Sequence, residues 1–227
     1  MKHAIINAST HTEITAPLLT AIADAIERQL CECYAPLHQS AGASVILGAV
    51  GTDFDPDTNV IAVLDDSDQA GALGYHSVQP NGRPFTRVFV NPILANGGTL
   101  TRGALALSVT ISHEALEATH NPYTLNWSDG PSGRQYACEI GDPVESDFYE
   151  IDNIAVSNFV GPRWFSDATG PYDWLGNLTA PWTMSKGGYL IVREPGGDPT
   201  SVFGEEFPEW KKPLKQRIHR MRGHAVA

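Results

Sequence analysis

The pattern of apolar and polar residues in the first 90 positions predicts several short strands and one helix. Residues 13–34 carry apolar side chains at three- and four-residue spacings, as one face of a helix does. Thr12 is the expected N-cap of this helix, and Pro36 is expected to end it. Residues 71–79 are polar and Gly-rich, which indicates an exposed edge strand. The other predicted strands are apolar runs bounded by turn residues: 2–8, 45–50, 60–64 and 85–90.

A second helix is predicted to begin at Thr99 or Thr101, either of which can cap it, and to end near Thr119. Its front half is apolar nearly all round, which is typical of a helix buried within a domain. Its back half carries charged and titratable residues instead. We therefore expect a buried helix that brings polar groups into the protein interior. These groups are His113, Glu114, Glu117 and His120.

The rest of the chain is predicted to be rich in loops. Tryptophans are scattered among Gly and Pro residues, and short strands are predicted near 135–140, 147–160 and 188–193. We expect an α+β fold with a mixed twisted sheet, an antiparallel edge strand, a backing helix and the buried helix. Residues 1–205 are expected to form one domain, followed by a terminal extension over 206–227.

The charge is distributed unevenly along the chain. The net charge is −11, yet residues 211–227 hold six Lys and Arg residues and no acidic residue. Residues 1–210 therefore hold nine basic and 26 acidic residues, a balance of −17. An acidic body disfavours nucleic acid and anionic membranes as main partners. The basic extension is expected to be a solvated terminus or to dock on an acidic surface.

Cysteine content and the N-terminal residues bear on the compartment. The three cysteines, Cys31, Cys33 and Cys138, make a poor disulfide framework, which favours free thiols in a reducing compartment. Neither a signal peptide nor a stretch long and apolar enough to cross a membrane is recognised. We expect a cytoplasmic or virion-associated protein, and the sequence leaves its oligomeric state open.

The spacing of His113 and Glu117 predicts a metal site. Residues four apart lie on one face of a helix, so both side chains can bind one ion. Glu114 is placed as the general base would be in an H-E-x-x-H zinc site. Here Glu117 replaces the second His, and a carboxylate is an accepted zinc ligand. Because buried charges need partners, we expect one Zn²⁺ or, as the alternative, a tight network without metal.

The third ligand is expected from the segment 135–146, at its junction with the helix. Glu139 lies 22 residues after Glu117 and is slightly favoured over Asp142, which can instead orient His113. Glu145 is a more distant candidate. Three roles are left open for His120: a group that surrounds the metal ligands, a fourth ligand, or a residue that the dipole favours at the C-terminal end of the helix. Glu117-x-x-His120 also has the spacing of di-iron bundles, but those need two such motifs.

Several motifs resemble those of a family of uncharacterised phage and bacterial proteins. The matching stretches run from about residue 60 onward and are SHEALEATHNP, YACEIGDPVE, VSNFVGPRWF, YDWLG and GGYLIV. The resemblance implies a zincin-like metallopeptidase fold and a link to phage particles or prophages. It makes His113, Glu114, Glu117, Glu139, Asp142 and Glu145 the motif positions. Asn158 stands where the family has Asp, and His120-Asn121-Pro122 where it has an apolar residue and then Asp-Pro.

By analogy with zincin-type peptidases, residues 71–79 and 85–90 take the place of the edge strand and its neighbour. A substrate peptide adds to that edge as an extra strand. The sequence does not choose an oxyanion stabiliser among four candidates near the expected cleft. These are His76, Tyr123, Tyr149 and Tyr172.

The function expected from the sequence is that of a zinc-dependent hydrolase, a metallopeptidase with a peptide or protein substrate. An amidase acting on cell-wall peptides shares the same chemistry. The alternative is a phage or prophage structural protein that keeps a zincin scaffold, binds other phage structural proteins and has a structural or vestigial metal site.

Overall fold

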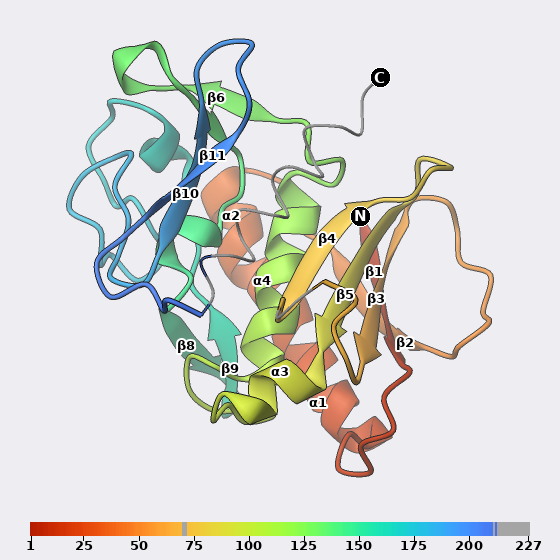
Figure 1. Ribbon diagram of the computed structural model, residues 1–227. Helices are drawn as coiled ribbons and strands as arrows, with labels where there is room; N and C mark the ends of the chain where they lie inside the picture. Colours follow the sequence, from red (N-terminus) through yellow and green to blue (C-terminus); the bar gives the residue numbers. More distant parts are fainter. Residues whose placement is uncertain (70–71, 211, 213–227) are drawn as a thin grey trace.

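The main sheet is mixed and has an antiparallel edge. The computed structural model describes residues 1–69, 72–210 and 212. Its largest sheet has five strands in the order β2-β1-β3-β5-β4 (Figure 1). Four strands are parallel, and β4 pairs antiparallel with β5 at the edge. The bounds are β1 Lys2–Asn7, β2 Ser44–Gly48, β3 Thr58–Leu64, β4 Gly74–Val78 and β5 Pro84–Phe89. The α+β class and the antiparallel edge within 71–79 are thus confirmed.

One face of this sheet is covered by two helices, α1 (Ala16–Arg28) and α4 (Leu107–His120). Alternate residues of a strand point to opposite faces, so Ile61 and Val63 are fully buried while Ala62 is only partly buried. The buried side also carries polar groups, among them His76 of β4. His76 therefore reaches the candidate site from the sheet.

The first helix differs from its prediction at both ends. Thr15, not Thr12, is the N-cap, and its side chain accepts a hydrogen bond from the backbone N–H of Leu18. After α1 the chain continues as a π-helix, η1 (Gln29–Tyr34), and then as α2 (Ala35–His38). Pro36 does not end the helical region, because it occupies the first turn of α2, where a missing N–H is tolerated.

The second helix is shorter than predicted but equally buried. It begins at Leu107, because Thr99 uses its hydroxyl to close a turn with the backbone of Arg102 and caps no helix. Residues 107–118 are all buried, as the apolar pattern of the front half predicted. A short helix, α3 (Val90–Ala95), follows β5 and was not predicted.

The C-terminal part packs on the opposite side of α4 from the main sheet (Figure 1). It contains a four-stranded sheet in the order β11-β10-β7-β6 and a hairpin of β8 and β9. The bounds are β6 Trp127–Asp129, β7 Gln135–Ala137, β8 Phe148–Ile151, β9 Ile154–Ser157, β10 Tyr189–Arg193 and β11 Thr200–Phe203. Short 3-10 turns join them: η2 Pro131–Gly133, η3 Asp142–Val144 and η4 Pro162–Phe165. Predicted strands thus exist within 135–140, 147–160 and 188–193, whereas β6 and β11 were missed.

The predicted extension begins inside the fold. Phe207 is buried and packs against Tyr189 and Phe203, so the first residues after 205 belong to the hydrophobic core around β10 and β11. The basic part of the predicted extension, apart from Lys212, lies outside the described residues. Within the described ranges, no helix is long and apolar enough to cross a membrane.

Candidate metal centre

A buried hydrogen-bond network fixes the side of α4 that faces away from the main sheet. The Ser112 hydroxyl donates to Gln29 Oε1 at 2.6 Å and accepts from the backbone N–H of Ser157 at 2.9 Å. Gln29 Nε2 donates to the carbonyl of Ser157 at 2.7 Å, which closes the network. These three residues are hydrogen-bonded to one another, so the network holds α4 against η1 and β9 in one orientation about the helix axis.

A second buried network holds the end of α4 against the sheet. Asn59 Nδ2 donates to His3 Nδ1 at 2.9 Å, which leaves the ring proton on Nε2 to donate to the Thr119 hydroxyl at 2.8 Å. Asn59 also exchanges hydrogen bonds with Thr86, which lies opposite His76 in the β5–β4 register. Burial lowers the pKa of His3 to about 3, so this imidazole is neutral at physiological pH.

His113 and Glu117 point the same way from α4 and meet Asp142 of η3. His113 Nε2 lies 3.3 Å from Glu117 Oε1 and 3.4 Å from Asp142 Oδ1. The exposed fraction of these side chains is 8% for His113 and 3% for each carboxylate. One ligand atom from each of the three lies within 4.8 Å of the other two. The i, i+4 spacing and the segment after residue 135 thus come together as the sequence analysis expected.

His76 belongs to a second group on the sheet side of the cluster. Its Nδ1 lies 3.2 Å from Glu114 Oε2 and 3.5 Å from Glu117 Oε2. Its Nε2 lies 3.5 Å from Glu139 Oε2, and its exposed fraction is 1%. His76, Glu117 and Glu139 therefore form another group with ligand atoms within 4.8 Å. The sequence analysis considered His76 only as an oxyanion stabiliser.

Two glycines allow the backbone to come this close. A Cβ on Gly74 of β4 would lie 2.9 Å from the Thr110 side chain and 3.3 Å from Glu114 Cγ. A Cβ on Gly141 would lie 2.6 Å from His113 Nδ1. All three distances are shorter than van der Waals contact, so only glycine lets β4 and the 138–142 segment approach α4 without displacing it.

The charges of the cluster shift the pKa of its members. Burial and the nearby charges of Asp142 and Glu139 raise the pKa of Glu117 to about 7, although His113 lowers it. Burial alone would lower the pKa of His113, but the charges of Glu117 and Glu114 hold it well above 6.5. Concentrated carboxylates of this kind favour a bound cation, since each raises the free energy of ionising its neighbour.

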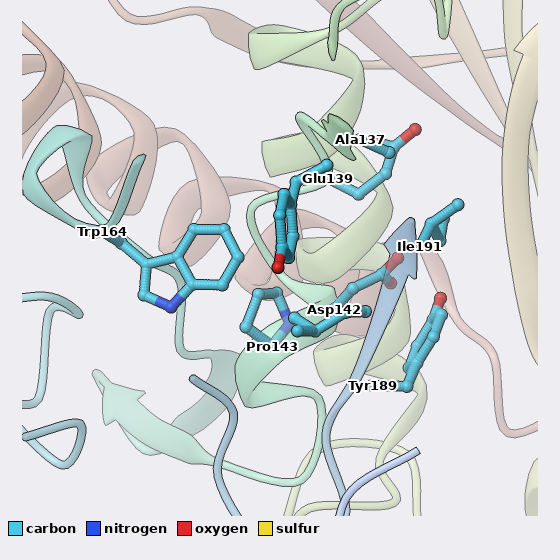
Figure 2. Close-up of a pocket in the computed structure, with 9 residues that line it drawn as sticks. Ala137, Glu139, Asp142, Pro143, Trp164, Tyr189 and Ile191 are labelled. Carbon is cyan, nitrogen blue, oxygen red and sulfur yellow. The ribbon is translucent and has the colours of Figure 1, made fainter. Parts of the chain in front are cut away.

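A narrow pocket leads to two of the carboxylates (Figure 2). Trp164 lies at one end and Tyr189 and Ile191 at the other, with Asp142 between them. Burial and the charge of Asp142 raise the pKa of the Tyr189 hydroxyl well above 10, so this group stays protonated. The pocket is too tight to hold a free water molecule.

The other sequence candidates lie outside both groups. Glu145 is half-buried at the end of η3, and His120 contacts the Tyr34 hydroxyl through Nδ1 at 3.1 Å. Tyr149 accepts a hydrogen bond from Gln29 on the far side of α4, and Tyr123 is exposed. Of the four oxyanion candidates, His76 alone is in the cluster.

The donor set and its spacing fit a divalent metal. Imidazole nitrogen and carboxylate oxygen both bind Zn²⁺, at about 2.0–2.2 Å, so neighbouring ligand atoms of a tetrahedral site lie about 3.3–3.6 Å apart. The 3.3 and 3.4 Å separations around His113 Nε2 fall in this range. They are longer than an ordinary N–H···O hydrogen bond of about 2.9 Å. The residues present therefore suit a metal better than a compact hydrogen-bonded network.

Comparison with protein-family models, with curated proteins and with solved structures finds no match to this chain. The resemblance to phage and bacterial proteins stays an expectation.

Proposed function

We propose that this protein is a zinc-dependent hydrolase of the metallopeptidase type, built on a zincin-like scaffold. The observation that carries the proposal is the buried group of His113, Glu117 and Asp142 with Glu114 beside it on the same helix. Asp142 rather than Glu139 completes this group, because Asp142 Oδ1 lies 3.4 Å from His113 Nε2.

Each of these residues has a distinct role in the proposed reaction. His113, Glu117 and Asp142 hold the ion, which when bound polarises a substrate carbonyl and makes water more acidic. Glu114 takes a proton from the attacking water and returns it to the leaving amine. His76 Nδ1 lies 3.2 Å from Glu114 Oε2, so this imidazole borders the general base. Gly141 N–H points to Glu117 Oε1 at 3.3 Å and fixes the orientation of that ligand.

The edge strand β4 is the proposed docking place for the substrate backbone. Within the described residues β4 pairs only with β5, and His76 of β4 reaches Glu114. An extended peptide that adds to this edge would run along the strand that carries His76. No β4 residue lines the pocket beside Glu139 and Asp142, so a peptide on this edge would bind outside that pocket.

The experiment combines metal analysis with hydrolysis assays on the full chain. Protein purified without added metal is expected to hold zinc and to cleave casein, a peptide library or cell-wall peptides. Glu114→Gln is expected to keep the metal and to lose at least ~99% of the activity, as removal of a general base does. Glu150→Gln, an exposed carboxylate outside the cluster, is the matched control and is expected to behave like wild type. Absence of bound metal would refute the metal site.

A structural metal site is the second candidate, favoured by the closure of the cluster. Structural zinc sites are closed, whereas catalytic sites keep an open position. Here the ligand side chains are 1–8% exposed. In this case zinc ties α4 to the loop-rich C-terminal part, as a virion component or other assembly protein would use it. It predicts that His113→Ala lowers the melting temperature while neither wild type nor Glu114→Gln hydrolyses any substrate.

A further inference from the structure

We infer that the cluster holds two divalent metal ions and that Glu117 bridges them. The second ion is bound by His76 and Glu139 together with Glu117. This inference rests on the proposed function, because it adds an ion beside the one held by His113, Glu117 and Asp142. The two groups share Glu117 and no other residue.

The two carboxylate oxygens of Glu117 face different groups. Oε1 lies 3.3 Å from His113 Nε2, whereas Oε2 lies 3.5 Å from His76 Nδ1. A carboxylate that uses one oxygen for each of two ions holds them about 3.5–4 Å apart, the separation of known two-metal sites. Glu117 is 2% exposed and lies within the buried stretch of α4, so packing restricts the orientation of its side chain.

Glu139 is oriented toward the second group by its own partner. The side-chain oxygen Oδ1 of Asn121 accepts hydrogen bonds from the backbone N–H groups of Leu125 and Asn126, which directs Nδ2 of the same amide away from them. That Nδ2 donates to Glu139 Oε1 at 3.4 Å, while Glu139 Oε2 lies 3.5 Å from His76 Nε2. Outer partners of this kind are what set the direction of metal-binding carboxylates.

The second group meets the same limit on ligand spacing as the first, because one ligand atom from each of its three residues lies within 4.8 Å of the other two. Glu117 Oε2 lies 3.5 Å from His76 Nδ1, and Glu139 Oε2 lies 3.5 Å from His76 Nε2, so both carboxylates border the same imidazole. Thr86 and Asn59 lie under this side of the cluster, so the imidazole rests on a fixed polar surface of the sheet.

The donor chemistry indicates which ions fit. Each group offers one imidazole and two carboxylates, a mixed set that suits first-row divalent ions such as Zn²⁺, Mn²⁺ and Fe²⁺. The carboxylates of Glu114, Glu117, Glu139 and Asp142 thus converge on the two imidazoles.

The experiment counts ions in the full chain. Protein stripped with a chelator is dialysed against excess Zn²⁺ or Mn²⁺, and bound metal is measured by mass spectrometry. We expect two ions per chain in wild type and one in His76→Ala or, as a milder change, His76→Gln. His120→Ala, a histidine of α4 outside both groups, is the control and should keep two ions. For the Mn²⁺ form, electron paramagnetic resonance should show a coupled pair in wild type and an isolated six-line signal in the His76 variants.

The outcomes separate this inference from the proposed function. One ion in wild type, lost in His113→Ala and kept in His76→Ala, overturns the two-metal centre and leaves the single-metal hydrolase standing. No bound ion overturns both. Two ions without magnetic coupling overturn the bridging role of Glu117. Because the wild-type count decides between these cases, the inference stays testable even if a variant fails to fold.

Discussion

Gly141→Ala tests the contact between the 138–142 segment and the metal-binding helix. The added Cβ would lie 2.6 Å from His113 Nδ1 and 2.7 Å from Cε1. Gly141 has a φ of −85°, which alanine adopts without strain, so the whole effect comes from the contact with the ring. Neither partner can move easily, because Gly141 N–H points to Glu117 Oε1 and His113 lies in a fully buried stretch of α4.

The expected magnitude follows from overpacking. Inserting a methyl group into a packed interior lowers the free energy of unfolding by about 1–3 kcal/mol. For a chain of this size each kcal/mol corresponds to about 2–4 °C in melting temperature. The metal-free variant should therefore melt about 4–8 °C below wild type if the loss is about 2 kcal/mol. Displacement of the His113 ring should also weaken zinc binding by about 10–100-fold.

The assay is thermal unfolding followed by circular dichroism on metal-free protein, together with zinc titration against a chromophoric chelator. Gly197→Ala is the control, since its Cβ would lie on the exposed surface 3.2 Å from the Glu194 carbonyl oxygen. If Gly141→Ala melts within 1 °C of the control and binds zinc with unchanged affinity, the close approach of this segment to His113 is refuted.

Three further predictions concern the parts that support the site. Ser112→Ala should lower the free energy of unfolding, measured in urea, by about 1–3 kcal/mol, because Gln29 Oε1 and the backbone N–H of Ser157 lose the hydroxyl to which they are hydrogen-bonded. An unchanged free energy of unfolding would contradict the network. His3 has a pKa of about 3 when folded and 6.5 when unfolded, so the unfolded state binds the proton first and stability falls as pH drops from 6.5 toward 3. Urea unfolding at pH 7.5 and at pH 5 measures how far the free energy of unfolding falls between the two values. This fall should be smaller in His3→Gln than in wild type, by at most about 1.4 kcal/mol per pH unit below 6.5, and equal falls would refute the contribution of His3. Phe207→Ala should cost about 3 kcal/mol, and a loss below 0.5 kcal/mol would mean that the residues after 205 do not pack as described.

The sequence predicted those features of the site that depend on local periodicity. The apolar front half of α4 indicated burial, and the four-residue spacing placed His113 and Glu117 on one face. The antiparallel edge could also be predicted, since the polar, Gly-rich segment before β5 differs from the apolar strands. These predictions held because neighbours along a helix or strand determine them.

Contacts between distant segments could not be predicted in the same way. His76 joins the cluster because Gly74 lets β4 approach α4, and no pattern near residue 76 encodes that approach. The start of α4 differs from its prediction because Thr99 closes a turn instead of capping a helix. The threonine hydroxyl forms hydrogen bonds to the backbone in either structure, so the residue type alone does not distinguish them. The choice between Glu139 and Asp142 likewise depended on how η3 meets the helix.

The network around Ser112 has a consequence for synthesis of the protein on the ribosome. Its members Gln29, Ser112 and Ser157 are far apart in the chain, with sequence separations of 83, 45 and 128 for the bonded pairs. Domains fold as units during translation, beginning from the N-terminal side. A nascent chain that ends at α4 already has the main sheet but lacks Glu139, Asp142 and the β9 strand that fixes the helix. Metal loading should therefore begin only after the segment up to Ser157 has emerged.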